Sequence, residues 1–202
     1  MNYFHRITDV MPNGVISFER CVQQKPFPEF ETATDKLQPV TVTGTGFIER
    51  EGEEYVQVDF ANCYIGGGVL GRGCVQEEIR FLISPELIAS MLITEMMETN
   101  ECVIITGAEM FSEYSGYADT YKYKGNKIDS RRRDLLMRKM TQIVAMDAAP
   151  YYDDKLSQYS AQNIYRDLQK AYIAFNSTNP NAAIATGNWG CGAFGGDSQL
   201  KV

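Results

Sequence analysis

Two short apolar runs constrain the possible folds of this chain most strongly. Val103–Thr106 and Ile143–Met146 are unbroken runs of apolar and β-branched residues, and each is too short to be a typical helix. Runs of about four to eight such residues are typical of strands buried on both faces of a sheet. Ile164–Phe175, by contrast, carries apolar side chains at helical spacing along one face. Buried strands in alternation with amphipathic helices predict an α/β sandwich around a largely buried sheet.

Further segments of the chain carry weaker signals for strands, a helix start and a turn. Strands are expected in Val15–Phe18, Val40–Ile48, Tyr55–Phe60 and Ala182–Thr186. Ser84-Pro85-Glu86 predicts a helix start, because it combines an N-capping residue, a proline in the first turn and an acid that the helix dipole favours. Arg131-Arg132-Arg133 is expected to form an exposed turn.

The overall charge argues against one broad class of partner. The 202 residues include 19 basic and 26 acidic side chains, for a net charge of −7. A protein that binds the nucleic-acid backbone needs a basic surface, so no direct DNA binding is expected.

No stretch approaches the ~20 consecutive apolar residues that span a membrane. Met1–Val10 lacks the apolar core of a secretory signal. No membrane partner is therefore expected.

The cysteines and the single histidine narrow the possible chemistry. The cysteines are Cys21, Cys63, Cys74, Cys102 and Cys191. Their number is odd and no C-x-x-C pair occurs, so reduced thiols are expected rather than a disulfide framework or a zinc site. The only histidine is His5, which argues against serine–histidine or cysteine–histidine catalysis. Carboxylates are the expected acid–base groups of any enzyme here, with no metal or cofactor implied.

A glycine-rich loop follows the last predicted strand. Gly187–Gly196 contains Gly190-x-Gly192-x-x-Gly195, and Gly66-x-Gly68-x-x-Gly71 has the same spacing. Backbone amides in such loops can hold an anion such as a pyrophosphate. The pattern equally fits a tight strand–helix turn, and as a dinucleotide fingerprint it leaves open a nicotinamide-dependent oxidoreductase. Neither loop ends in the Gly-Lys-Ser of a P-loop, which disfavours a P-loop nucleotidase.

Acidic and amide side chains gather around the first of these loops. Asp59 lies near the end of a predicted strand, and seven residues separate Gly68 from Gln76-Glu77-Glu78. Glycoside cleavage needs a carboxylic acid that protonates the leaving oxygen, and closely spaced acids help to keep one of them protonated. The same acids also fit a solvated helix start favoured by the helix dipole. Spacing alone does not decide between these interpretations, or between Glu77 and Glu78.

Several of these segments together resemble the poly(ADP-ribose) glycohydrolase family. The resemblance rests on Gly66-Gly67-Gly68 followed by Gln76-Glu77-Glu78, and on the stretches 58–62, 106–107, 115–118 and 187–197. It implies a macrodomain-like three-layer α/β sandwich with a mixed sheet, with an accessory segment over residues 1–40 and the core over 41–202. Relative to the family's catalytic region, the chain is expected to lack sequence at both ends, so that the fold is incomplete at the C-terminus.

The resemblance also implies a reaction and a role for each site residue. The reaction is hydrolysis of ribose–ribose O-glycosidic bonds in poly(ADP-ribose), which releases ADP-ribose. Glu78 would be the general acid and then the base that activates water, Glu77 would orient the ribose, and Asp59 would support the acidic site. The implied substrate-binding residues are Ile48 and Glu49 on the adenine side, Asn62, Gly66, Gly67, Gly68, Gln76, Tyr117 over the substrate, and Asn188, Trp189, Gly190, Cys191, Gly192 and Ala193 around the diphosphate.

The resemblance finally implies partners and a cellular setting. Poly(ADP-ribose) and poly(ADP-ribosyl)ated proteins would be bound by a monomer in the nucleus or the cytoplasm, as part of the response to DNA damage. Because of the segments that are expected to be missing, a truncated and catalytically inactive form that binds ADP-ribose is the alternative.

Overall fold

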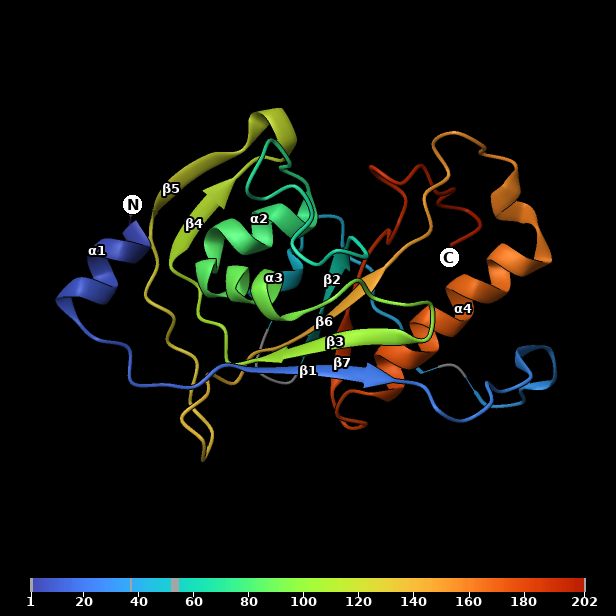
Figure 1. Ribbon diagram of the computed structural model, residues 1–202, viewed down its shortest axis with the longest axis horizontal. Coiled ribbons are helices and arrows are strands. Elements are labelled where there is room, and N and C mark those ends of the chain that lie inside the picture. The colour runs from blue at the N-terminus through green and yellow to red at the C-terminus, as the bar shows by residue number, and fades with distance from the viewer. Residues whose placement is uncertain (1, 37, 52–54, 202) are drawn as a thin grey trace.

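A five-stranded sheet forms the centre of the computed structural model, which describes residues 2–36, 38–51 and 55–201 (Figure 1). In spatial order its strands are β1 (Ser17–Val22), β3 (Glu101–Thr106), β6 (Gln142–Asp147), β2 (Tyr55–Ala61) and β7 (Ala183–Ala185). β2 runs parallel to β6 and β7, whereas β3 is antiparallel to β1 and β6. The sheet is therefore mixed, as expected, and the carboxyl ends of its three parallel strands share one edge.

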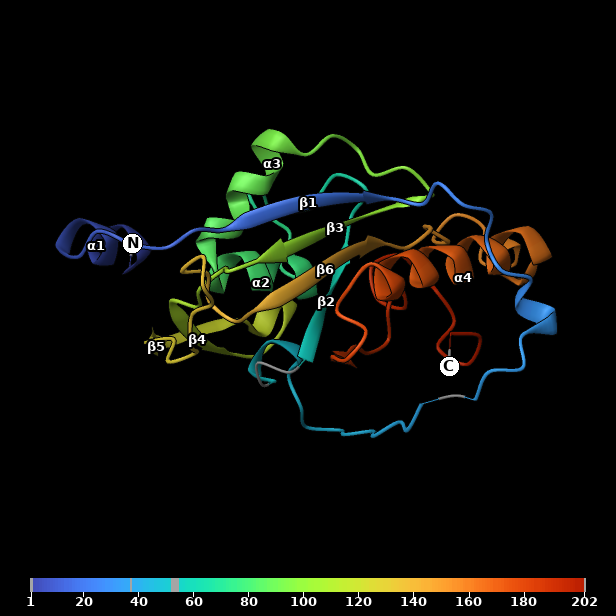
Figure 2. The same ribbon diagram turned by 90° about the horizontal axis from the view of Figure 1, so that it is seen from below.

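Helices cover both faces of this sheet (Figure 2). One face carries α2 (Gln76–Ile83), the 3-10 helix η3 (Pro85–Ala89) and α3 (Ser90–Ile93), and the other carries α4 (Ala161–Asn176). Successive residues of β3 point to opposite faces: Ile104 packs in the cluster of α4, and Ile105 packs in the cluster of Phe81 on α2. Both faces of the strand are buried, which explains its unbroken apolar sequence and confirms the three-layer α/β sandwich.

Smaller elements surround this core. They are α1 (Asn2–Asp9), the hairpin of β4 (Ser112–Ser115) and β5 (Lys122–Asn126), and the 3-10 helices η1 (Phe30–Thr32), η2 (Ile48–Arg50), η4 (Ala118–Thr120) and η5 (Ser157–Tyr159). The sequence analysis did not predict the hairpin, because its strands are polar and short. Within the described residues, no helix combines the length and the apolar character required to cross a lipid bilayer.

The segment Val40–Ile48 is not a strand, so that prediction was wrong. Val40 and Val42 are 81% and 89% exposed. The residues around them are mainly threonines and glycines, so the segment has no large apolar face to dock against the sheet. It forms an exposed connection that reaches the rim of the site at η2.

Two other predicted elements differ in position or type. The strand expected in Val15–Phe18 starts at Ser17 and continues to Val22, where it pairs with β3 along its whole length. Residues 1–40, expected to form an accessory segment, thus contribute a strand to the central sheet. The helix expected at Ser84 begins as the 3-10 helix η3 and becomes α-helical only at Ser90.

Candidate functional site

The loop from β2 to α2 holds Glu77 with main-chain donors. Glu77 Oε2 accepts a hydrogen bond from the amide of Asn62 at 3.0 Å, and Glu77 Oε1 accepts one from the amide of Gly66 at 2.6 Å. The Asn62 side chain is used locally, because its Oδ1 accepts from the amide of Tyr64 at 3.0 Å. Glu77 is only 2% exposed. Its carboxyl is therefore fixed inside the protein at the carboxyl edge of β2.

Glu78 is held in the same way from the other side of the loop. Its Oε1 accepts from the amide of Gly68 at 2.9 Å, and its Oε2 accepts from the amide of Val75 at 2.8 Å. Val75 immediately precedes α2, so Glu78 also satisfies an amide at the start of its own helix. Glu78 is nevertheless only 6% exposed. The acids do open a helix, but the solvated helix start considered from the sequence is wrong.

The glycines of this loop allow the backbone to approach both carboxyl groups. A Cβ atom at Gly67 would lie 2.6 Å from Glu78 Oε1 and 2.7 Å from Glu77 Oε2. A Cβ atom at Gly73 would lie 2.5 Å from Glu78 Oε1. The amides of Gly66 and Gly68 donate hydrogen bonds to the carboxyl groups of Glu77 and Glu78. The glycines of this G-x-G-x-x-G pattern therefore bind side chains of the protein itself.

Asp59 completes a buried cluster of three acids. It is 1% exposed. Its side chain lies on the same face of β2 as that of Ala61, which packs in the cluster shared with α2. Burial raises the pKa of Asp59 above its usual range, Arg80 opposes this rise and Glu78 adds to it. Burial also raises the pKa of Glu77, and the charge of Asp59 adds to that rise. Three acids so close together cannot all ionise easily, so the cluster can retain a proton near neutral pH.

Gln76 connects the start of α2 to the backbone of β2. Its Oε1 accepts from the amide of Phe60 at 2.8 Å, and its Nε2 donates to the carbonyl of Val58 at 3.0 Å. β7 pairs only with residues Tyr55 to Gln57 of β2. Beyond the end of β7, the side chain of Gln76 takes over as the hydrogen-bond partner of the β2 backbone. The amide group thus positions the two glutamates that follow it.

We expect Gln76→Ala to lower the free energy of unfolding by about 1–3 kcal/mol, because it leaves two partly buried main-chain groups of β2 without partners. Chemical denaturation measures this change. Gln24→Ala is the matched control, since Gln24 is exposed and its truncation should change stability by less than about 0.5 kcal/mol. Equal losses in the two variants would contradict the role assigned to Gln76.

A cavity of about 220 Å³ opens beside the acid cluster. It is lined by Gly46, Phe47, Ile48, Glu49, Gln76, Ile79, Arg80, Tyr114, Gly116 and Tyr117. The fold thereby brings together Ile48, Glu49, Gln76 and Tyr117, which the sequence analysis placed in one site. Aromatic and aliphatic walls with a few polar groups are typical of a pocket for a flat organic ligand.

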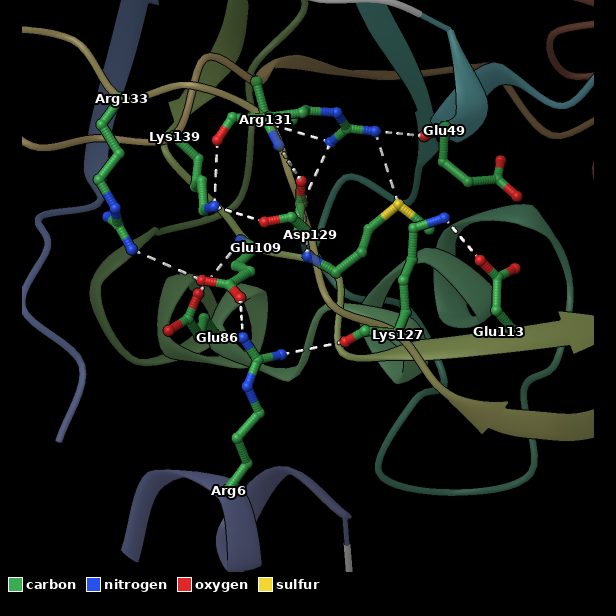
Figure 3. A network of polar contacts seen from close by, with 12 residues as sticks. Arg6, Glu49, Glu86, Glu109, Glu113, Lys127, Asp129, Arg131, Arg133 and Lys139 are labelled. Atoms are coloured by element: carbon green, nitrogen blue, oxygen red, sulfur yellow. Dashed lines mark hydrogen bonds and ion pairs between the residues drawn. The ribbon is translucent and has the colours of Figure 1, made fainter. Parts of the chain in front are cut away.

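A buried polar network holds Glu49 at the wall of this cavity (Figure 3). The Tyr114 hydroxyl donates a hydrogen bond to Glu49 Oε1 at 2.5 Å, and Arg131 Nη2 donates one to the main-chain carbonyl of Glu49 at 2.7 Å. Arg131 Nη1 also lies 3.5 Å from Asp129, whose carbonyl accepts from Lys139 Nζ at 2.6 Å. The Arg131 side chain is only 13% exposed, so the predicted exposed turn is wrong for this residue.

The second glycine loop is anchored on the end of β6. Trp189 Nε1 donates to the carbonyl of Met146 at 3.0 Å, and Lys201 Nζ lies 4.6 Å from the centroid of a Trp189 ring. Gly190 has φ of +75°, and a Cβ atom there would lie 2.7 Å from Ala148 Cβ. The buried Trp189 side chain therefore fixes the loop in place.

The two glycine loops lie along the same edge of the sheet. The first follows β2 and the second follows β7, and these neighbouring strands are parallel. A Cβ atom at Gly187 would lie 3.5 Å from the ring of Phe60, near the end of β2. At the tip of the second loop, Gly192 and Ala193 are exposed, and their amides donate to no acceptor in the described part of the chain. These amides are available to an anionic ligand.

Some residues of the site were absent from the sequence-based prediction. Arg80 and Tyr114 line the cavity, and Arg131 supports Glu49. Arg80 follows Gln76 by one helical turn, so helical spacing was a signal that could have placed it in the site. Among residues 2–36, 38–51 and 55–201, no group of three or more histidine, cysteine, aspartate or glutamate side chains could hold a metal ion.

The fold and the site together define a class of protein. A mixed sheet covered by helices on both faces, with glycine loops at one edge, is an α/β sandwich. The family model described as poly(ADP-ribose) glycohydrolase, macro domain fold, matches residues 27–202. The chain belongs to the poly(ADP-ribose) glycohydrolase family, which replaces the nicotinamide-dependent oxidoreductase interpretation.

Three relatives show the extent of this similarity. Poly(ADP-ribose) glycohydrolase 1 of Arabidopsis thaliana is 33% identical over 100% of this chain and 49% of its own length. Poly(ADP-ribose) glycohydrolase 1 of Caenorhabditis elegans is 38% identical over 98% of this chain and 27% of its own length. Poly(ADP-ribose) glycohydrolase 2 of Caenorhabditis elegans is 35% identical over 98% of this chain and 44% of its own length. The chain thus spans no more than about half the length of these curated relatives.

Proposed function

We propose that this chain hydrolyses ribose–ribose O-glycosidic bonds in poly(ADP-ribose) and releases ADP-ribose. The observation that carries the proposal is the buried cluster of Asp59, Glu77 and Glu78, in which glycine-loop amides hold both glutamates in a chain of this family. Glycosidases of the common type need a carboxylic acid that keeps its proton in a shielded site. Burial and mutual repulsion among the three acids supply that condition.

In the proposed reaction, Glu78 donates its proton to the departing ribose oxygen as the glycosidic C–O bond breaks. The remaining negative charge of the cluster stabilises the oxocarbenium-like sugar. The Glu78 carboxylate then accepts a proton from the water molecule that attacks the anomeric carbon, and so returns to its acid form. Glu77 orients the ribose through its hydroxyl groups, because each of its oxygens retains a lone pair beyond its bond to a backbone amide.

The rest of the substrate is proposed to bind along the same edge of the sheet. The exposed amides near Gly192 and Ala193 would hold the diphosphate. The cavity beside Ile48, Glu49 and Tyr117 would receive the adenine. Tyr117 is 51% exposed, which suits a side chain that covers a ligand. The proposed partners are therefore poly(ADP-ribose) and proteins that carry it, in the nucleus or the cytoplasm.

A second candidate function is binding of ADP-ribose without hydrolysis. The observation that favours it is the partial coverage of the relatives, since the chain spans 49% of the Arabidopsis thaliana protein named above. The acid cluster and the second loop would still bind ribose and diphosphate in such a chain.

One experiment separates the two functions. The purified 202-residue chain is incubated with radiolabelled poly(ADP-ribose), the released ADP-ribose is separated and counted, and ADP-ribose binding is measured in parallel by calorimetry. Release of monomer is the expected result. Binding without release would favour the second function, and absence of both would contradict the site.

A further inference from the structure

Arg80 is a buried residue of the cavity wall whose guanidinium has no hydrogen-bond partner among the described residues. It lines the cavity and is only 4% exposed. Within residues 2–36, 38–51 and 55–201, none of its side-chain nitrogens has a hydrogen-bond acceptor. A buried guanidinium with unsatisfied donors is unfavourable unless an acceptor of opposite charge compensates it. A nearby acid should therefore serve as its counter-ion.

Asp59 on β2 is likewise a buried ionisable residue whose side chain lacks a hydrogen-bond partner among the described residues. Neither of its carboxyl oxygens has a hydrogen-bond partner in the described part of the chain, although the residue is 1% exposed. α2 is fastened to β2 by Gln76, which bonds the main chain on both sides of Asp59. Arg80 follows Gln76 by one turn on the same face of the helix. The helix therefore directs the guanidinium toward this part of β2.

The other acids near Arg80 already have partners. The charged or titratable groups around Arg80 and Asp59 are Glu77 and Glu78 on α2, Glu49 on η2, Tyr114 on β4, and Asp129 and Arg131 between β5 and β6. Glu49 accepts from Tyr114, Asp129 accepts from the amide of Met110, and both glutamates of α2 accept from backbone amides. Asp59 is the acid in this group whose carboxyl has no hydrogen-bond partner among the described residues.

Electrostatics support the same pairing. Burial raises the pKa of Asp59, and Arg80 is the group that opposes this rise. Burial lowers the pKa of Arg80 to about 10, and the charge of Arg131 adds to that fall, whereas Glu49, Asp59 and Asp129 oppose it. Each group thus favours the charged form of the other across the interface between α2 and β2.

We propose that Arg80 is a positioning residue that serves as the counter-ion of Asp59 and favours the ionised form of this carboxyl. An ionised Asp59 disfavours a second negative charge close by and so favours a proton elsewhere within the acid cluster. The proposed function uses the proton there. The effect of this pair on catalysis therefore rests on the proposed function. The electrostatic pairing of Arg80 with Asp59 does not depend on it.

Carboxyl-carbon NMR titration tests the pair without any need for turnover. The signal of Asp59 is assigned by its loss in Asp59→Asn, and its midpoint is compared in the unsubstituted chain, in Arg80→Lys and in Arg80→Met. We expect the midpoint to rise by about one pH unit or more in Arg80→Met, because an opposite charge is lost. In Arg80→Lys, which keeps the charge, it should stay close to that of the unsubstituted chain. An unchanged midpoint in Arg80→Met would overturn the proposal.

A second measurement covers the case in which Arg80→Met does not fold. If Asp59 is the counter-ion, the double variant Arg80→Met/Asp59→Asn removes both charges and should melt at a higher temperature than Arg80→Met alone. A double variant that melts no higher, or that also fails to fold, would contradict the pairing. Since neither measurement depends on hydrolysis, failure of this proposal is distinguishable from failure of the proposed function.

Discussion

Glu78→Gln is expected to reduce hydrolysis of poly(ADP-ribose) by about 10²–10⁴-fold, which is the usual contribution of a positioned general acid or base. Glutamine keeps the size of the side chain but has no carboxyl proton to donate to the departing ribose oxygen. It also cannot accept a proton from the attacking water. Binding of ADP-ribose should be affected much less, because the diphosphate loop and the cavity are unchanged. The rate of release of radiolabelled ADP-ribose and calorimetry with ADP-ribose measure the two effects.

Glu86→Gln is the matched control for this experiment. Glu86 also opens a helix, and its Oε2 accepts from the amide of Glu109 at 3.2 Å. It does not line the cavity of the site. The control variant should therefore hydrolyse the polymer at close to the unsubstituted rate. A Glu78→Gln chain with unaltered turnover would remove Glu78 from the proposed role.

Gly73→Ala is expected to reduce hydrolysis by about 10²-fold, because displacement of a catalytic group by roughly 1 Å has an effect of this size. The new methyl group would lie 2.5 Å from Glu78 Oε1 and 2.7 Å from Glu78 Cδ, so the carboxyl must move. Gly73 does not have a left-handed φ, and backbone strain does not add to this effect. The rate of polymer hydrolysis, together with the melting temperature, measures the outcome.

Gly71→Ala provides the control from the same loop. A Cβ atom at Gly71 would have its nearest contact at 3.4 Å, with the carbonyl of Gly68, and Gly71 also lacks a left-handed φ. Its hydrolysis rate should remain close to that of the unsubstituted chain. Equal losses in both variants would show that the loop tolerates no side chain at all, and full activity of Gly73→Ala would show that Glu78 is not held as described.

The parallel strands explain why two distant glycine loops lie at one edge of the sheet. The first glycine loop follows β2, and the second follows β7 more than a hundred residues later. Because β2 pairs with β7 in parallel, both loops leave the same edge of the sheet. This shared edge is the arrangement that the proposed function requires, because one extended ligand would contact the acids of the first loop and the exposed amides of the second.

Much of this fold could be predicted because its signals are local. The buried strands β3 and β6 have unbroken apolar sequences, and α4 has a clear apolar face, so each was located close to its observed bounds. The prediction failed for Val40–Ile48, where two exposed valines looked like strand residues. It also failed for Arg131, whose burial depends on Glu49 and Thr141 from other parts of the chain.

The sequence by itself located the glycine loops and the neighbouring acids, because glycines, acids and apolar spacing are properties of short segments. It could not establish that Glu77 and Glu78 are buried with both oxygens bonded to backbone amides. Nor could it show that Arg80 and Asp59 are both buried without a hydrogen-bond partner among the described residues. The tertiary structure decided these points, because burial and charge neighbours depend on which distant segments pack together.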